Sequence, residues 1–230
     1  MSLETELQLE LKKQSVDLFC CADITHLSED QNRGFPTAIL IGIRLSPEYL
    51  QMIINTPDYV EEMKQNNQKE EDEFDLKEKM TDRIADELAD FITSKGYSAF
   101  SQSEANLYSV GTYDEKNHRT PLPHKTIALL AGLGWIGKHD LLITPKFGSA
   151  LIICTVLTNA PLSTAPLTSS IPKCGNCTIC VDICPTRAIK GMTWNINRSR
   201  EELVDVYNCT MCLKCLAFCP WTIKYMKNNL

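Results

Sequence analysis

The chain has 230 residues, of which 43% are hydrophobic, and its formal net charge at pH 7 is −6. An acidic chain argues against a general binder of polyanions, because binding phosphates requires clustered Lys and Arg. The longest uninterrupted apolar runs, such as residues 38–41 and 150–153, are far too short to span a bilayer, so no membrane association is expected.

The start of the chain predicts two helices and two strands. Leu3, Leu7 and Leu11 recur at four-residue intervals, as on one face of an amphipathic helix. Ser46 and Pro47 are residue types preferred at the N-cap and the first position of a helix. We therefore expect helices over residues 3–14 and 46–55 and strands over residues 16–24 and 36–45.

A strongly periodic helix is predicted to follow a charged segment. Residues 61–73 are charged and rich in Asn and Gln, which indicates a solvated helix face or a mobile excursion. After Phe74, an apolar residue recurs at every fourth position from Leu76 onward, and Gly96 sits where a left-handed C-cap belongs. A strand is expected over residues 97–101. The apolar stripe is expected to be core and comprises Leu76, Met80, Ile84, Leu88 and Ile92.

A G-x-G-x-x-G sequence spans residues 132–137, after a helix predicted over residues 124–131. A dinucleotide-binding loop instead follows a strand and has an acidic residue about twenty positions later, whereas residues 141–181 contain no Asp or Glu. The match to that fingerprint is therefore interpreted as false. The glycines either let the backbone approach something flat or bulky closely, or form a plain helix C-cap and turn. A hairpin is predicted next, with strands over residues 141–144 and 150–158.

Eight of the eleven cysteines form two copies of the spacing C-x2-C-x2-C-x3-C-P, after a Ser-, Thr- and Pro-rich linker over residues 159–172. This spacing predicts two [4Fe-4S] clusters, in which the fourth cysteine of each run ligates the cluster of the other run. The first cluster is assigned to Cys174, Cys177, Cys180 and Cys219, and the second to Cys209, Cys212, Cys215 and Cys184. Small buried hydrophobic roles are expected for Cys20, Cys21 and Cys154.

Zinc sites and disulfides are the competing interpretations of the two runs. Zinc sites normally use two C-x2-C pairs and leave no role for a third and fourth cysteine in each run. Disulfides need an oxidising compartment, but residues 1–13 are charged and contain no apolar signal region, so a cytoplasmic protein is expected. A purely structural role of the clusters is the alternative to electron transfer. The predicted domains are residues 1–165 and residues 166–230.

A polar segment over residues 102–125 is the best candidate for an active site. A reduction fed by single electrons must also add protons, and histidine and tyrosine side chains can supply them. The candidate catalytic residues are His118, Tyr108 and Tyr113. Taken singly, each such side chain is more often a solvated loop residue than a catalyst.

The sequence Ala131-Gly-Leu-Gly-Trp-Ile-Gly-Lys138, followed by Leu141-Leu-Ile-Thr-Pro-Lys-Phe-Gly148 and the two cysteine runs, resembles the epoxyqueuosine reductase family and the related corrinoid-dependent reductive dehalogenases. The likeness extends from about residue 11 to residue 221. It implies an α+β fold, in which a nitroreductase-like domain holds base-off cobalamin and a ferredoxin-like domain with two [4Fe-4S] clusters reduces its cobalt. The implied cofactor-binding residues are Gly132, Gly134, Trp135, Gly137, Lys138, His139, Phe147 and Gly148.

Departures from the family pattern affect the expected substrate. The family continues into helical repeats that hold tRNA, whereas this sequence stops at Leu230, eleven residues after Cys219. We therefore expect a short member that does not act on tRNA. The family's proton-donating aspartate corresponds, by gapless counting, to His118, and Asp114 is out of register. The second cysteine run is compact here and is interrupted by a long insertion in the family.

The leading hypothesis is an iron–sulfur oxidoreductase whose two [4Fe-4S] clusters reduce a bound cobalamin and, through it, a small-molecule substrate. In this hypothesis Lys138 and His139 steady the polar rim of the cofactor. The alternative is an electron-transfer protein that reduces a corrinoid or flavin on a redox partner protein and has no substrate of its own. FMN in the amino-terminal domain is a further alternative to cobalamin.

Overall fold

The computed structural model of the chain describes residues 2–56, 58–166 and 171–229, so residues 167–170 of the predicted linker lie outside the described residues. The chain divides into two units. The first comprises Met1–Ile43, Lys77–Gly132 and Ile152–Ser169, and the second comprises Arg44–Leu76, Leu133–Leu151 and Ser170–Leu230. The second unit thus groups the cysteine-rich segment with two earlier segments, while the predicted domain boundary at residues 165 and 166 stays a prediction.

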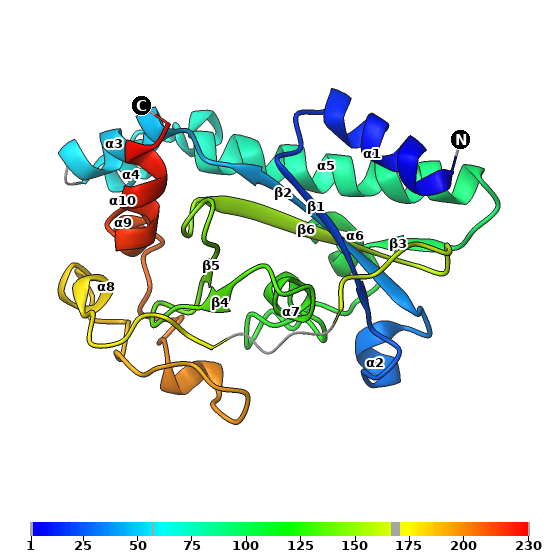
Figure 1. Ribbon diagram of the computed structural model, residues 1–230. Coiled ribbons are helices and arrows are strands. Elements are labelled where there is room, and N and C mark those ends of the chain that lie inside the picture. Colours follow the sequence, from blue (N-terminus) through cyan, green and yellow to red (C-terminus); the bar gives the residue numbers. More distant parts are fainter. Residues whose placement is uncertain (1, 57, 167–170, 230) are drawn as a thin grey trace. The chain divides into compact units, whose positions relative to one another are not determined.

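The first unit contains a four-stranded sheet with helices on both faces. Its elements are α1 (Leu3–Lys13), β1 (Leu18–Asp23), α2 (Glu29–Asn32), β2 (Thr37–Arg44), α5 (Glu73–Ser94), β3 (Ala99–Ser101), α6 (Glu104–Ser109), α7 (His124–Leu130) and β6 (Leu151–Thr158). The strand order is β1-β2-β6-β3, and the β1–β2 and β3–β6 pairs are antiparallel. Helices α1 and α5 lie along one face of the sheet, and α7 lies on the other (Figure 1).

The core of the first unit lies between the sheet and the helices α1 and α5. Leu7 and Leu11 of α1 are buried there, as their spacing predicted, and burying a leucine side chain contributes roughly 1.5–3 kcal/mol. Cys21 and Cys154 are buried as predicted, and Cys20 is partly buried. Burial raises the pKa of the Cys21 thiol to about 12, which fits an unreactive core residue.

The apolar stripe of α5 is core only in its later turns. Ile84, Leu88 and Ile92 are buried, and Met80 packs against them. Leu76 is 52% exposed, so its prediction as a core residue was wrong. Each four-residue interval rotates about 40° beyond a full helical turn, so four intervals separate the first and last side chains by about 160°. A strict spacing of four therefore cannot keep five side chains on one core.

A short helix, α6, lies within the polar segment predicted as residues 102–125. The Ser103 hydroxyl caps it by accepting a hydrogen bond from the Asn106 N–H (3.4 Å). Sequence reasoning found few regular-structure signals in this segment and did not predict a helix here. The serine N-cap followed by an acidic first turn is the signal that could have located it.

The second unit consists mainly of short helices around the cysteine-rich segment. Its elements are α3 (Pro47–Asn55), α4 (Tyr59–Gln65), η1 (Lys69–Glu71), β4 (Trp135–Ile136), β5 (Leu142–Ile143), α8 (Ile179–Asp182), η2 (Arg200–Glu202), α9 (Lys214–Ala217) and α10 (Pro220–Lys227). Ser46 caps α3 as predicted, since its hydroxyl accepts a hydrogen bond from the Tyr49 N–H (3.1 Å). Helix α3 contacts α9 and α10, and the Tyr225 hydroxyl donates to the Leu45 carbonyl (2.9 Å).

The predicted hairpin between residues 141–144 and 150–158 is wrong, because β5 pairs with β4. The turn after β5 is closed by the backbones of Thr144 and Gly148, which exchange hydrogen bonds of 2.8 and 3.0 Å. Gly134 explains the pairing. A Cβ at Gly134 would lie 1.9 Å from the Ile143 carbonyl oxygen, so a larger residue could not bring β4 this close to β5.

The length and polarity of each helix decide whether it can cross a membrane. The 22-residue helix α5 carries acidic and basic residues along its length. Within residues 2–56, 58–166 and 171–229, no helix is both long and apolar enough to cross a bilayer. The cytoplasmic location stays a prediction.

His124, at the start of α7, lies in an environment that disfavours its charged form. Its Nδ1 lies 2.9 Å from the Thr155 hydroxyl of β6. Burial lowers the pKa of His124 from its ordinary value of 6.5 to about 4. The folded chain therefore holds this imidazole neutral near pH 7.

We expect the stability of the chain to decrease as the pH falls from about 6.5 to about 4. Over this range the unfolded chain protonates His124 before the folded chain does, so added protons favour unfolding. The His124→Gln variant keeps a hydrogen-bonding side chain and does not titrate, so its stability should fall less over the same range. Urea unfolding at a series of pH values measures both proteins. Identical pH dependence would contradict this role of His124.

Candidate functional site

Four cysteines line one cavity of about 200 Å³ in the second unit. Three come from the first run and the fourth, Cys219, comes from the second. They are the four residues assigned to the first cluster, namely Cys174, Cys177, Cys180 and Cys219. Burial, followed by the neighbouring thiols, raises the pKa of Cys180 to about 11. Cys180 therefore keeps its proton until a metal displaces it. The cavity shared by the four cysteines supports the crossed assignment.

The cysteines assigned to the second cluster also lie close to one another. Burial, followed by the thiols of Cys212 and Cys209, raises the pKa of Cys215, with smaller effects of Cys180 and then Cys184. Burial disfavours the thiolate of Cys184, but backbone hydrogen bonds and the Thr186 hydroxyl (3.7 Å) leave its pKa below the ordinary value. A thiol that ionises readily is a ready metal ligand.

The cysteine groups surround space and do not meet at one point. In the part of the chain that the structure describes, no three Cys, His, Asp or Glu side chains converge closely enough to hold a single metal ion. A zinc ion takes its four ligands at about 2.0–2.3 Å, whereas four thiolates bind the separate corners of a [4Fe-4S] cube. A cavity of about 200 Å³ between four thiols fits the larger group.

Local backbone geometry explains how the second run wraps around its site. Met211 and Leu213 have φ angles of 52° and 59°, and these left-handed residues turn the chain between successive ligands. Cys219 is the N-cap of α10, and Pro220 occupies the first helical position, where proline is favoured. The fourth cysteine is therefore fixed at the start of a helix, apart from the three that precede it.

An apolar wall beside Cys219 contains a buried donor without a partner. Trp135 and Ile143 contact Cys219, and the Trp135 and Trp221 rings pack edge to face with centroids 4.8 Å apart. The Trp135 indole N–H is buried and has no hydrogen-bond partner among the described residues. Such a donor costs about 1–3 kcal/mol if it stays unpaired. Cluster sulfurs accept hydrogen bonds of this kind, so the orphaned donor fits a cluster at this site.

Lys138 and His139 also line the first cavity, although they were predicted to contact a corrinoid. The Lys138 Nζ donates to the Cys177 carbonyl (3.0 Å). The His139 Nδ1 accepts from the Leu141 N–H (3.2 Å), so the neutral ring carries its proton on Nε2, which lies 3.2 Å from the Ser149 hydroxyl. Both side chains are buried, and Lys138 is hydrogen-bonded to the loop that carries the first cysteine run.

The other residues implied for a corrinoid have partners within the chain. Gly132 ends α7 with a φ of 67°, as the C-cap alternative predicted. A Cβ on Gly148 would lie 2.3 Å from the Thr222 nitrogen, and Phe147 packs on Tyr225 with ring centroids 5.8 Å apart. Seven of the eight implied residues, all except Gly132, are buried. As a set, these residues offer few exposed side chains for a corrinoid to contact. Cobalamin binding by them stays a prediction.

The three predicted proton donors lie together in the first unit, with Tyr108 in the last turn of α6 and Tyr113 and His118 on the loop that follows it. The Tyr113 hydroxyl lies 3.2 Å from the His118 Nδ1, and the Tyr108 and Tyr113 rings are 4.8 Å apart. The backbones of Asp114 and Arg119 close the loop with hydrogen bonds of 2.8 and 3.1 Å. His118 has a φ of 47°, a conformation that non-glycine residues rarely adopt. The catalytic role of the three residues stays a prediction.

Sequence reasoning missed three residues that line the first cavity, namely Ile143, Lys173 and Trp221. Lys173 directly precedes Cys174, and Trp221 follows Cys219 by two positions, so their proximity to ligands was a usable signal. Ile143 had no such signal, because only the β4–β5 pairing brings it to the cysteines.

Comparison with known proteins identifies relatives of the chain. A family model described as a 4Fe-4S dicluster domain matches residues 173–223. The epoxyqueuosine reductase of Synechococcus sp. (strain CC9605) is 51% identical over 71 residues, which cover 31% of this chain and 22% of that protein. The epoxyqueuosine reductase of Atelocyanobacterium thalassa (isolate ALOHA) is 33% identical over 125 residues, which cover 47% of this chain and 40% of that protein. The chain is a relative of the epoxyqueuosine reductases.

Solved structures share the fold of this epoxyqueuosine reductase relative. A reductive dehalogenase associated with B12-dependent dehalogenation matches 97% of this chain and 32% of that chain, with a TM-score of 0.64 and 18% identity. An epoxyqueuosine reductase with a tRNA stem loop matches 96% of this chain and 65% of that chain, with a TM-score of 0.55 and 17% identity. The predicted α+β fold with a ferredoxin-like region is confirmed. The matched segments cover well under half of the two curated relatives.

Proposed function

We propose that this chain is an iron–sulfur oxidoreductase whose two [4Fe-4S] clusters reduce a bound cobalamin and, through it, a small-molecule substrate. The observation that carries the proposal is the cavity lined by three cysteines of one run and the fourth cysteine of the other. Relatives named epoxyqueuosine reductase and a neighbour associated with B12 support the corrinoid part. When bound, cobalamin supplies a low-valent cobalt that acts as a nucleophile or one-electron reductant.

The residues of the chain would divide the remaining tasks. The eight cysteines of the two runs hold the clusters, and Trp135 and Ile143 keep water away from the first cavity. Excluding water strengthens every electrostatic interaction inside the site. His118 would hold the proton for the substrate, because its Nδ1 faces the Tyr113 hydroxyl and Nε2 is then the atom that can release it.

The His118→Ala variant is expected to lower turnover roughly 10²–10⁴-fold, the usual contribution of a general acid, and to leave the iron content unchanged. His26→Ala is the matched control, because His26 is another exposed histidine of the first unit. Turnover is measured anaerobically with a reduced viologen as electron donor, on an aryl bromide and on epoxyqueuosine nucleoside. Full activity of His118→Ala would remove this residue from the mechanism.

An electron-transfer protein that reduces a corrinoid or flavin on a partner is the second candidate function. The burial of seven of the eight implied corrinoid residues favours it. Residues 207–211, at the start of the second cysteine run, are all exposed, so a redox partner could contact them. They include Tyr207, Cys209 and Met211.

Reconstitution with iron and sulfide under anaerobic conditions, with or without added cobalamin or FMN, separates the two functions. The oxidoreductase should retain cobalamin in a stoichiometric amount after gel filtration and reduce a substrate alone. Retention of neither cobalt nor flavin, together with electron transfer only to a corrinoid or flavin on another protein, would establish the carrier and contradict the oxidoreductase. A stoichiometric amount of flavin without cobalt would show that the cofactor is FMN and not cobalamin.

Transfer RNA needs a separate arm of the assay. The net charge of −6 argues against a broad phosphate-binding surface, whereas a structural neighbour holds a tRNA stem loop. We therefore compare an epoxyqueuosine-modified stem loop with the free nucleoside. Faster turnover of the stem loop would overturn the proposal of a small-molecule substrate.

A further inference from the structure

We propose that the two cluster sites of the second unit lie in opposite electrostatic surroundings, so that the first cluster has the higher reduction potential and accepts electrons from the second. The inference rests on the proposed function only in requiring that both cysteine groups hold [4Fe-4S] clusters. Lysines line the first site, and an acidic segment contacts the second. All of the residues involved belong to one unit.

The first site carries positive charge at close range. Lys138 and Lys173 line the four-cysteine cavity, and among the described residues no Asp or Glu lines it. Lys138 is only 8% exposed, and its Nζ is fixed by the hydrogen bond to the Cys177 carbonyl (3.0 Å). The Lys173 ammonium lies 5.4 Å from the centre of the Trp135 ring. A fixed ammonium stabilises the negative charge that reduction adds to a cluster, and therefore raises the reduction potential.

The segment that contacts the second site is strongly acidic. Residues 58–75 contain eight Asp or Glu and two Lys, a formal charge of −6, which equals the net charge of the whole chain. Much of this segment was predicted as a solvated or mobile stretch, and sequence analysis assigned it no function. Negative charge beside a cluster opposes the addition of an electron and lowers the reduction potential.

Four hydrogen bonds attach this acidic segment to the loop of the second cysteine run, and one of them runs from the Lys64 Nζ to the Met211 carbonyl (3.4 Å). The Lys64 Nζ donates to the Thr210 carbonyl (2.5 Å), and the Thr210 hydroxyl donates to the Glu61 Oε1 (3.3 Å). The Lys214 Nζ donates to the Asp58 Oδ1 (2.8 Å). Thr210 lies between Cys209 and Cys212, and Lys214 lies between Cys212 and Cys215. The acidic segment is therefore held directly against the ligand loop.

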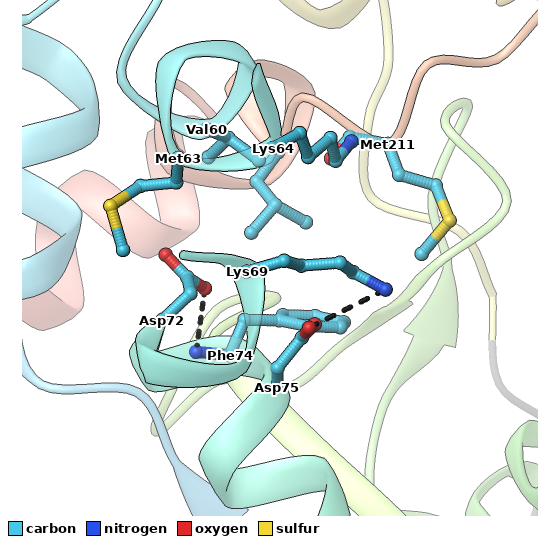
Figure 2. Close-up of a pocket in the computed structure, with 9 residues that line it drawn as sticks. Val60, Met63, Lys64, Lys69, Asp72, Phe74, Asp75 and Met211 are labelled. Carbon is cyan, nitrogen blue, oxygen red and sulfur yellow. Dashed lines mark hydrogen bonds and ion pairs between the residues drawn. The ribbon is translucent and has the colours of Figure 1, made fainter. Parts of the chain in front are cut away.

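Helix α4 and the ligand loop meet around a very small cavity. Figure 2 shows Val60, Met63 and Lys64 of α4 on one side of it and Met211 of the ligand loop beside them. The cavity measures about 10 Å³, room for about one water molecule. Asp72 also lines it, is 3% exposed, and has one carboxylate oxygen without a hydrogen-bond partner among the described residues. Solvent screens such buried carboxylates less than it screens exposed ones.

Two lysines also reach this loop, and nearby carboxylates balance their charges. Lys214 is paired with Asp58 (2.8 Å). Lys64 shares α4 with Glu61 and Glu62, and one Glu61 oxygen is buried without a hydrogen-bond partner in the described part of the chain. The local excess of charge at the second site is therefore negative.

The difference between the two sites gives the electron a direction. Each transfer moves one electron, which oxidises the second cluster and reduces the first, and no proton takes part. A one-electron donor protein then restores the reduced state of the second cluster. The exposed thiol of Cys209 places the second site where such a donor can approach.

Anaerobic redox titration of the holoprotein, followed by low-temperature EPR, tests the proposal. Cys184→Ala keeps the first cluster and Cys219→Ala keeps the second, so these variants assign the two signals. In the wild type we expect the first cluster to be reduced at the less negative potential. Lys138→Met should change the reduction equilibrium of the first cluster at least tenfold, about 59 mV more negative for a one-electron couple. Glu61→Gln retains the bond to Thr210 and should move only the second cluster, to a less negative potential.

Two controls separate charge from structure. Lys138→Arg keeps the positive charge and should keep the wild-type potential. Lys12→Met makes the same change in charge as Lys138→Met at an exposed residue of α1 and should move neither signal. A wild type without two clusters would contradict the proposed function itself. Two clusters with the opposite order of potentials, or with potentials unmoved by Lys138→Met and Glu61→Gln, would overturn this inference alone. If Lys138→Met loses its cluster, the order of the two reduction potentials in the wild type still tests the inference.

Discussion

Replacing Cys219 by alanine is expected to remove the cluster bound by the first cysteine run and to leave the cluster of the second run in place. Cys219 belongs to the second run in sequence but lines the cavity formed with Cys174, Cys177 and Cys180. A [4Fe-4S] cluster needs its four thiolates, so the iron content should fall by about four per chain. Iron and sulfide analysis of the anaerobically reconstituted protein measures the loss, and EPR shows which signal remains.

Four single variants make the crossed arrangement testable without prior assignment of the signals. Cys219→Ala should lose the same EPR signal as Cys177→Ala, and Cys184→Ala should lose the same signal as Cys212→Ala. If Cys219→Ala instead matched Cys212→Ala, each run would bind its own cluster. Cys154→Ala is the control, because Cys154 is a buried thiol outside both runs and its loss should cost about 1 kcal/mol and no iron.

Replacing Gly148 by alanine is expected to destabilise the second unit by roughly 2–5 kcal/mol. A Cβ there would lie 2.3 Å from the Thr222 nitrogen, which is backbone of α10 and cannot yield without moving the helix. Gly148 also has a φ of 58°, a conformation that costs an alanine about 1–2 kcal/mol. Because α10 begins directly after Cys219, the same displacement should lower the iron content of the first site.

Gly191→Ala is the matched control for Gly148→Ala. Gly191 also belongs to the second unit and has a positive φ of 77°, but a Cβ there would make an ordinary contact of 3.4 Å with Val181. It should therefore show only the conformational cost, about 1–2 kcal/mol, and keep both clusters. Urea midpoints and iron contents of the two variants measure the difference. Equal losses of stability and iron in the two variants would show that the contact between Gly148 and α10 does not contribute to stability.

Features of the fold that depend on local chemistry were predictable from sequence. The hydroxyl of Ser46 caps α3, and Pro47 occupies its first turn, as expected from preferences that act within a few residues. The spacing of the cysteines is also a local signal, and it predicted the four thiols that line the first cavity. In these cases the physical cause lies within one turn or one loop of the chain.

Features set by contacts between distant residues were not predictable. The β4–β5 pair exists because Gly134 lets the backbone approach Ile143, and no spacing in the sequence indicates that partner. Lys64 reaches Thr210, 146 positions later in the chain. The acidic segment therefore had no visible link to the second cysteine run until the fold placed the two together.

The candidate active-site residues also divide into those that a local signal predicted and those whose position depends on distant contacts. Tyr108, Tyr113 and His118 were grouped because reactive side chains are dense in one polar segment, and the structure brings them together. The residues proposed for a corrinoid came from resemblance alone. Lys138 and His139 lie in the wall of the first cluster cavity, where the hydrogen bond to the Cys177 carbonyl and the contact with Ser149 hold them, and their role toward a corrinoid stays a prediction.

Metal and sulfide analysis of the chain, reconstituted without oxygen, tests most directly whether both cysteine groups hold clusters. We expect about eight irons and a matching amount of acid-labile sulfide per chain, the content of two four-iron clusters. Zinc in place of iron, or an iron content well below that value, would contradict the claim.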